Sequence, residues 1–223
     1  MFAASSLTES FGVLGRRLER QRPGTSVSFN FASSSDLAVQ ITQGAPADVF
    51  ASADPRQMKV VTGAGLASDP VRFASNRLVI LVPRGNPAGI RRARDLARSG
   101  IVLVLAAPAV PAGSYARTVL ERLGIAPEAG ANLVSNEADV KAVVTKVALG
   151  EADAGIAYVT DVTGDVAPDV EVIHFPAAAQ VIAHYPIATL AEAPNPAGAG
   201  AFFELVTSEE GQRVLSSHGF GPP

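Results

Sequence analysis

The feature that most limits the fold is a regular alternation of short apolar stretches with segments of helical periodicity. Residues 77–82 and 101–105 are largely apolar runs without the alternating pattern of a half-exposed strand, which indicates strands buried on both faces. Other segments place apolar residues at helical spacing, as Phe11, Leu14 and Leu18 show. This order predicts an α/β protein with largely parallel sheets, in which ligands bind beyond the carboxyl ends of the strands.

The periodicities and turn residues define the expected elements. We expect strands at residues 1–4, 27–31, 49–51, 77–82, 101–105, 154–158, 170–175 and 181–190. We expect helices up to residue 20 and at residues 37–43, 55–63, 92–99, 115–123, 140–149, 201–206 and 208–216, with a linker at 195–200. Pro186 should interrupt the ladder of its strand.

Composition excludes several classes of function. The 223 residues allow one large domain or two lobes of about 100 residues each. A net charge of −3 gives no basic surface for nucleic acid or an anionic membrane. The chain has no cysteine, which excludes thiolate chemistry, disulfides and cysteine-based zinc sites.

The beginning of the chain contains no signal peptide. Met1–Ala4 already has the pattern of a strand end, with almost nothing before it. We therefore expect that processing or trimming has removed an upstream segment, either a cleaved signal or a lipid-anchored linker.

A run of three serines, Ser33–Ser35, joins an expected strand to an expected helix. The first N–H groups of a helix lack intrahelical partners and lie at the positive end of its dipole, so this junction suits an anion. The pattern of Ser33 with Asp36 also fits an ordinary helix cap. For this turn taken alone, the helix cap is the favoured interpretation.

The same arrangement recurs at four places in the chain. Each lies at the N-terminus of an expected helix: Ser5-Ser6, where Ser6 and Glu9 fit a capping box, Ser33–Ser35, Pro111–Gly113 and Asp139-Val140. None contains a lysine or arginine, although Lys141 follows the last. Neutral hydroxyls and backbone amides suit a small, fully ionised oxyanion, and the recurrence favours anion binding over capping.

Enzymatic signatures are missing. The chain has no Gly-x-Ser-x-Gly elbow, Walker A motif or dinucleotide fingerprint. His174, His184 and His218 do not pair with carboxylates at the spacing of a triad or a metal site. We expect a protein that is not an enzyme, has no cofactor and has no direct ligands for a metal ion.

Four segments resemble the molybdate-binding proteins of bacterial ABC importers: Phe2–Leu7, Ala32–Asp54, Val110–Ala116 and Gly155–Asp161. The most specific piece is Gly-Ala-Pro-Ala-Asp-Val-Phe-x-Ser-Ala-Asp, which ends at Asp54. The resemblance runs in order along nearly the whole chain.

The resemblance implies a two-lobed periplasmic-binding-protein fold of type II. Lobe one would comprise residues 1–79 and 188–223, and lobe two residues 80–187. Each lobe would hold a mostly parallel sheet flanked by helices. The strands at 77–82 and 181–190 would carry the two crossovers, and the lobes would close on the ligand.

The resemblance also implies a ligand site. Ser6 and Ser34 would each offer a hydroxyl and a backbone N–H, Ala112 and Val140 a backbone N–H, and Tyr158 its phenol. Tyr115 is an alternative to Tyr158, and Ser5 an alternative or addition to Ser6. Asp36 lies close to the expected anion, and we expect its carboxylate to point away.

The implied function is capture of molybdate, or equally tungstate, outside the cytoplasm and delivery to an ABC permease. The protein would act as a monomer in the periplasmic or extracytoplasmic space. A phosphate ion carries a proton near pH 7 and needs an acceptor, which the expected contacts do not supply. The alternative is a binding protein or sensor for another tetrahedral oxyanion, such as sulfate.

Overall fold

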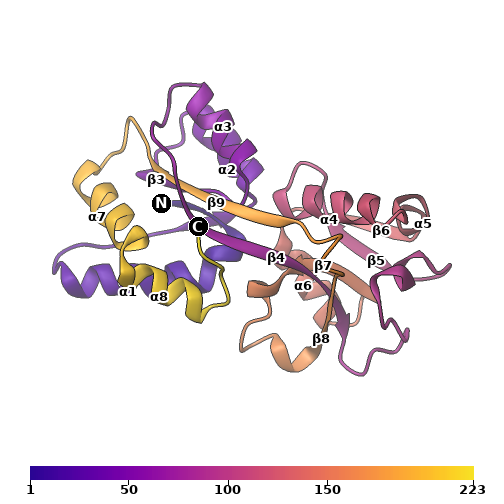
Figure 1. Ribbon diagram of the computed structural model, residues 1–223. Coiled ribbons are helices and arrows are strands. Elements are labelled where there is room, and N and C mark those ends of the chain that lie inside the picture. The colour runs from indigo at the N-terminus through magenta and orange to yellow at the C-terminus, as the bar shows by residue number, and fades with distance from the viewer. The chain divides into compact units, whose positions relative to one another are not determined.

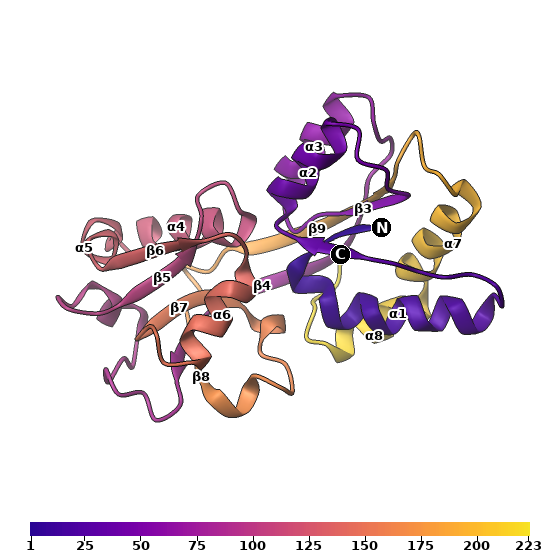
Figure 2. The ribbon, with the colours of Figure 1, turned by 180° about the vertical axis from the view of Figure 1, so that it is seen from behind.

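The computed structural model describes residues 1–223, which divide into two compact units. Unit 1 comprises Met1–Asn76 and Ala183–Pro223, and unit 2 comprises Arg77–Ile182. Each unit is a sheet with helices on both faces (Figures 1 and 2). The predicted α/β class is confirmed. The domain ranges implied by the resemblance stay a prediction.

The sheet of unit 1 has the strand order β2-β1-β3-β9, with the first three parallel and β9 antiparallel to β3. Its strands are β1 (Phe2–Ala4), β2 (Asn30–Ala32), β3 (Val49–Ala51), β9 (Ile182–Thr189) and the first half of β4 (Val71–Pro83). Its helices are α1 (Thr8–Gln21), α2 (Ser34–Thr42), α3 (Pro55–Gly63), α7 (Pro196–Thr207), α8 (Glu209–Ser217) and the 3-10 turn η1 (Ser5–Leu7). In Figure 1, α2 and α3 cover one face, and α1, α7 and α8 the other.

Two apolar layers hold unit 1 together. Between the sheet and α2 and α3 lie the buried side chains Phe2, Leu37, Ile41, Phe50, Met58 and Val61. On the opposite face Phe11 contacts Phe29, Phe73 and Phe202, with ring centroids 5.2–6.0 Å apart. Both faces of β1 and β3 are therefore buried, whereas the edge strand β2 is partly exposed. The carboxyl ends of these three parallel strands lie at one edge of the sheet.

Unit 2 contains three neighbouring parallel strands in the order β6-β5-β7. Its strands are β5 (Leu103–Ala106), β6 (Leu133–Glu137), β7 (Ala154–Tyr158), β8 (Val170–His174) and the second half of β4 (Val71–Pro83), which is antiparallel to β7 and β8. Its helices are α4 (Pro111–Arg122), α5 (Ala126–Ala131), α6 (Val140–Ala148) and the 3-10 turns η2 (Ala93–Ala97), η3 (Val159–Asp161) and η4 (Ala167–Asp169). Helices α4 and α6 pack against β5 and β7 from opposite sides (Figures 1 and 2).

Several predicted elements differ from the structure for local reasons. The expected strand at 27–31 is shorter and shifted, because the backbone N–H of Val27 donates to the Glu19 carboxylate instead of a sheet partner. The expected helix at 92–99 is only η2, because the Asp95 carboxylate accepts the backbone N–H groups of Arg91 and Arg92.

Near the C-terminus the predicted linker at 195–200 is wrong. Pro196 is the first residue of α7, and the Asn195 side chain accepts the backbone N–H of Gly198 at 3.0 Å. Proline at the first helical position and asparagine before it are favoured at a helix start. The expected loop Pro111–Gly113 likewise forms the first turn of α4, and the short helix α5 is not among the predicted elements.

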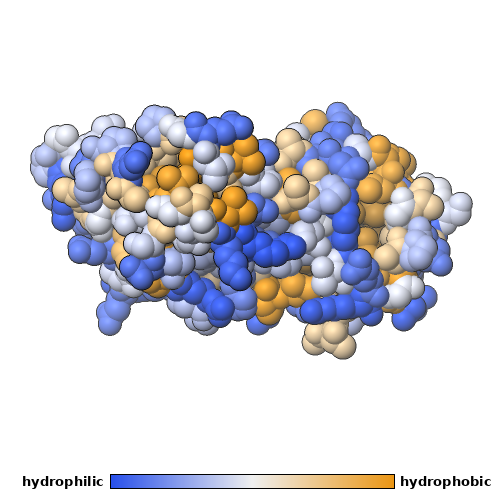
Figure 3. All heavy atoms as spheres, turned by 90° about the horizontal axis from the view of Figure 1, so that it is seen from above, coloured by the Kyte–Doolittle hydropathy of each residue, from blue (hydrophilic) through white to orange (hydrophobic).

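The surface mixes hydrophilic and hydrophobic residues, and the face shown in Figure 3 carries its apolar residues in small separate groups. The large apolar side chains that are exposed are Val39, Val60, Val71, Val134, Leu149 and Ile182. No helix combines the length and the apolar content that crossing a membrane requires.

Candidate functional site

The two serines of unit 1 occupy equivalent positions on neighbouring strands. Ala4 at the end of β1 pairs with Ala32 at the end of β2, and the strands are parallel. Ser6 and Ser34 each lie two residues beyond these paired alanines, and their exposed fractions are 3% and 1%. The register therefore places both buried hydroxyl residues at the carboxyl edge of one sheet, where α/β proteins bind ligands.

Ser34 is the first residue of α2, and its neighbour performs the capping. The Ser33 hydroxyl accepts the backbone N–H of Asp36 at 3.2 Å, so the predicted cap is confirmed. The Ser34 hydroxyl instead accepts the backbone N–H of Ala53 at 3.0 Å. Because that bond occupies an oxygen lone pair, the Ser34 proton remains available for donation to a ligand.

A polar turn after β3 fixes the direction of the Ala53 N–H. The Ser52 hydroxyl donates to the Asp54 carbonyl at 2.7 Å and accepts the Asp54 N–H at 3.1 Å. The Asp54 carboxylate is buried and binds the backbone and guanidinium of Arg56. The Ser52-Ala53-Asp54 end of the most specific motif thus holds the N–H group that donates to the Ser34 hydroxyl.

Ser6 lies inside η1 and is not a helix cap. The residue before α1 is Leu7, which makes no side-chain capping bond, so the predicted capping box of Ser6 with Glu9 is wrong. The Ser6 hydroxyl instead forms a 2.9 Å hydrogen bond with the Tyr185 hydroxyl of β9. Ser5 is also buried, and its carbonyl accepts the Thr8 hydroxyl at 2.7 Å.

The candidate residues of unit 2 follow the ends of its three parallel strands. Ala112 is the second residue of α4 after β5, Val140 is the first residue of α6 after β6, and Tyr158 ends β7. Their exposed fractions are 2%, 3% and 1%. Since the first N–H groups of a helix have no intrahelical acceptor, those of Ala112 and Val140 are suited to an anion.

The first turn of α4 lies unusually close to the strand before it. A Cβ atom built on Gly113 would be 2.2 Å from the carbonyl oxygens of Ala106 and Ala107. The Arg117 guanidinium holds the same region, donating to the carbonyl oxygens of Ala106 at 2.9 Å and Gly113 at 2.8 Å. Burial lowers the pKa of Arg117 from its ordinary value. Glycine is required here because any side chain would displace the Ala112 loop.

An ion pair balances the positive charge that lies beside the candidate donors of unit 2. Lys141 follows Val140, and its ammonium is 3.6 Å from the fully buried carboxylate of Asp161. That carboxylate also accepts the backbone N–H of Tyr158 at 3.0 Å. The Asp139 side chain caps α6 by accepting the Ala142 N–H at 3.0 Å. Donation to an anion here depends on dipoles rather than on net charge.

The remaining candidates lie nearby in sequence but differ in exposure. Tyr115 is half-buried on the first turns of α4, whereas Tyr158 is buried. Asp36 has an exposed side chain in the first turn of α2. The structure does not bring together three or more His, Asp or Glu side chains in a way that could hold a metal ion.

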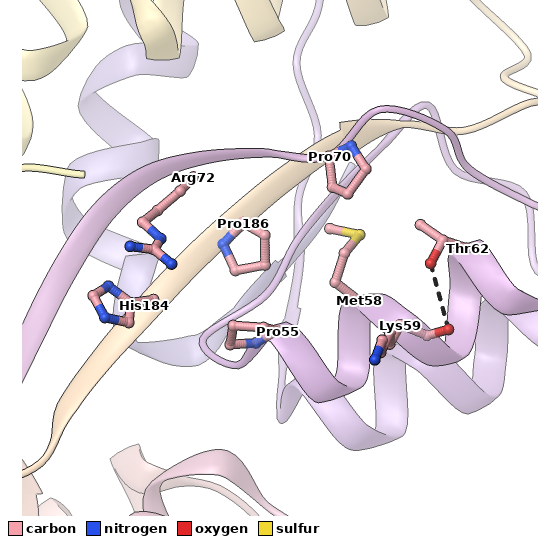
Figure 4. A pocket seen from close by; sticks show the side chains of 8 residues that line it. All are labelled: Pro55, Met58, Lys59, Thr62, Pro70, Arg72, His184 and Pro186. Carbon is pink, nitrogen blue, oxygen red and sulfur yellow. Dashed lines mark hydrogen bonds between the residues drawn. The ribbon is translucent and has the colours of Figure 1, made fainter.

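A separate pocket of about 280 Å³ lies in unit 1 between α3 and β9 (Figure 4). Its lining includes Met58, Arg72, His184 and Pro186, and none of the candidate donors. His184 Nδ1 is buried without a hydrogen-bond partner. Burial and the charge of Arg72 lower the pKa of His184 from its ordinary value.

The structure adds supporting residues that the sequence motifs do not contain. Tyr185 contacts Ser6, and Asn76 contacts Tyr185, although both lie far from Ser6 in the chain. The only local signal for Tyr185 is a polar hydroxyl within an apolar strand. Such a group needs a partner when buried, but the strand pattern does not say which one.

Two α/β units with helix N-termini at the carboxyl ends of parallel strands make up the type II periplasmic-binding-protein fold. The Azotobacter vinelandii periplasmic molybdate-binding protein superposes with a TM-score of 0.88 at 21% identity, covering 100% of this chain and 98% of that chain. The sulfate-binding protein SubI of Mycobacterium tuberculosis H37Rv also gives a TM-score of 0.88, at 17% identity, covering 99% and 85%. These two likenesses show the fold alone.

The chain belongs to the bacterial extracellular solute-binding protein family, whose model matches residues 1–221. The molybdate-binding protein ModA of Mycobacterium tuberculosis H37Rv is 45% identical over 224 residues, covering 100% of this chain and 84% of the relative. The resemblance stated from the motifs is thereby confirmed at the level of the family.

Proposed function

We propose that this protein captures molybdate, and tungstate equally, outside the cytoplasm and delivers it to an ABC permease. The observation that carries the proposal is the pair of buried serines at equivalent ends of β1 and β2. A relative 45% identical over the full chain is named as a molybdate-binding protein, which supports this choice of ion. The role is binding and delivery without catalysis, by a monomer in the periplasmic or extracytoplasmic space.

The proposed contacts are divided between the units. Unit 1 offers the hydroxyl and backbone N–H groups of Ser6 and Ser34, and unit 2 offers the N–H groups of Ala112 and Val140 and the phenol of Tyr158. A tetrahedral dianion has four oxygens that accept hydrogen bonds, and each bond to a charged group contributes about 1.5–3 kcal/mol. We infer that one ion needs donors from both units and favours the state in which both bind it.

Molybdate and tungstate are dianions of nearly the same size, so neutral donors bind both. Sulfate has shorter bonds and fits loosely in a set of donors spaced for molybdate. The fold itself does not choose between them, because a sulfate-binding protein shares it. Sulfate is therefore the alternative ligand.

Isothermal titration with molybdate, tungstate, sulfate and phosphate tests the proposal. We expect tight binding of the first two ions and weak or undetectable binding of the others. If sulfate binds as tightly as molybdate, the proposed ligand is wrong and the proposed site stands. If none of the four ions binds, the serine turns are structural only and the proposal is wrong.

A further inference from the structure

Strand β6, which leads to the candidate donor Val140, lies at the edge of its sheet. None of its residues is buried, and Val134 is 61% exposed. Its pairing with β5 also shifts by one residue between Leu133 and Ser135. An edge strand with little burial and an irregular ladder has a weakly specified register. Contacts other than apolar packing must therefore fix the end of β6 that precedes Val140.

Arg117 of α4 binds the ends of β5 and β6 together with the first turn of its own helix. One guanidinium nitrogen donates to the carbonyl oxygens of Ala106 at 2.9 Å and Gly113 at 2.8 Å. A second nitrogen donates to the side-chain oxygen of Asn136 on β6 at 2.5 Å. A guanidinium only donates, so the direction of all three bonds is fixed by chemistry. One side chain therefore joins the Ala112 loop to β6.

Two further bonds extend this restraint to α6. The backbone N–H of Ala107 donates to the Glu137 carbonyl at 2.8 Å, which joins the ends of β5 and β6. The Glu137 carboxylate accepts the Lys146 ammonium of α6 at 2.8 Å. Successive side chains of a strand point to opposite faces. The end of β6 is thus held from one face by α4, through Asn136, and from the other by α6.

We propose that Arg117 is a positioning residue that holds the two donor loops of unit 2, at Ala112 and Val140, in one arrangement before an ion binds. This inference rests on the proposed function, in which backbone N–H groups of both loops donate to the oxyanion. Donors that are already oriented lose little conformational freedom on binding, and they therefore bind more tightly. The planar fork of an arginine suits this role, because it reaches several acceptors in fixed directions.

The first test is molybdate titration of Arg117→Met, which removes the three bonds and keeps an unbranched apolar stem. We expect the affinity to fall roughly three- to tenfold, because both loops lose their support. The matched control is Arg122→Met on the same helix. The exposed Arg122 side chain donates to the Gln180 carbonyl at 2.8 Å and makes no hydrogen bond to either loop. Equal affinities of the two variants would overturn the proposal.

Arg117→Lys separates positioning from charge. Lysine keeps the positive charge but lacks the planar fork, so the affinity should stay close to that of Arg117→Met. If Arg117→Lys recovers the full affinity of the wild type, the charge suffices and the positioning role is wrong.

Amide hydrogen exchange in the ion-free protein tests the coupling of the loops directly. The Ala107 N–H reports on the junction of β5 and β6, and the Ser114 N–H reports on the first turn of α4. Arg117→Met should accelerate exchange at both amides. The control is the Asp153 N–H, which donates to a backbone carbonyl at 2.9 Å near the opposite end of β5 and should be unaffected. Equal acceleration at all three amides would indicate a general loosening of unit 2 and contradict the proposal.

Asn136→Ala removes only the link to β6. It should weaken molybdate binding less than Arg117→Met does, and it should accelerate exchange at Ala107 without changing exchange at Ser114. In the Arg117→Met background it should cost no further affinity, since its partner is already gone. In the Arg122→Met background it should keep its full effect. A full effect in both backgrounds would show that Asn136 does not act through Arg117, against the proposal.

The outcomes separate this inference from the proposed function. If the wild type binds no molybdate, both fail. If the wild type binds molybdate and Arg117→Met binds it equally well, only the role of Arg117 fails. Should Arg117→Met not fold, Asn136→Ala replaces it, because that substitution alters an exposed side chain. Unchanged affinity together with unchanged exchange at Ala107 in that variant would refute the positioning role.

Discussion

Single hydroxyl groups in unit 1 differ in what their protons do, although their burial is similar. Ser34 and Ser10 are both 1% exposed. The Ser10 hydroxyl donates to the carbonyl of Leu7, the residue before α1, whereas the Ser34 hydroxyl accepts from Ala53. Burial alone therefore does not distinguish these two serines, whereas the direction of their hydrogen bonds does.

This difference gives a matched pair of substitutions. Ser34→Ala should weaken molybdate binding by about 1.5–3 kcal/mol, because it removes a hydrogen bond to a charged group. Ser10→Ala should leave the affinity unchanged, since its proton is donated to the Leu7 carbonyl. Calorimetric titration of both variants, with thermal unfolding as a check on folding, measures the effect. Equal affinities of the two variants would remove Ser34 from the site.

At the scale of the element, the start of α4 depends on a backbone contact that only glycine permits. The Cβ of Gly113→Ala would meet two carbonyl oxygens at 2.2 Å, and backbone atoms cannot move aside as a flexible side chain can. We expect a loss of unfolding free energy of about 1–3 kcal/mol, together with weaker molybdate binding because Ala112 shifts. Urea denaturation and titration measure the two effects.

Gly130→Ala is the control for that substitution. Gly130 lies in the helix α5 of unit 2, and a Cβ built on it would have no neighbour within 4 Å. Alanine in a helix is favoured over glycine by about 0.5–1 kcal/mol. The control should therefore be neutral or slightly stabilised with normal affinity. A Gly113→Ala protein that behaves like this control would show that the close approach does not position the Ala112 loop.

Some elements have the same first and last residue in the prediction and in the structure, because residues next to them in the sequence set their ends. The strands β3 and β7 and the helix α3 match their expected ranges. Asp54 caps α3 and Gly65, with φ +75°, follows its end, so both boundaries are encoded nearby. The boundaries near Val27 and Asp95 are not predictable in this way. They depend on backbone N–H groups that donate to side-chain carboxylates in the folded chain.

In the candidate site too, some features are set by sequence neighbours and others by residues far apart in the chain. The cap formed by Ser33 and the start of α6 at Val140 follow from sequence neighbours, whereas α2 begins at Ser34 and not at the expected residue 37. The partner of Ser6 does not follow from its neighbours, because Tyr185 comes from a strand at the other end of the chain. A local capping pattern predicts Glu9 instead, which is wrong because the residue before α1 is Leu7.

At the scale of the whole molecule, the division of donors between two units makes a distinct prediction. Molybdate should slow amide hydrogen exchange around Ser6 and Ser34 in unit 1 and around Ala112 and Val140 in unit 2, because in the proposed function all four segments donate to one ion. Exchange in α8, which carries no proposed donor, serves as the internal control. Protection confined to one unit would contradict a shared ion and leave a binding site within that unit.

The neutral character of the donors has a consequence for the environment in which the protein works. Hydroxyls and backbone amides do not titrate near neutrality, a phenol ionises only near pH 10, and the charge of Lys141 is balanced by Asp161. The affinity for a fully ionised ligand therefore does not follow the acidity of the surroundings. Under the proposed function, the ion concentration that half-fills the protein should therefore be the same in an acidified habitat as in a neutral one.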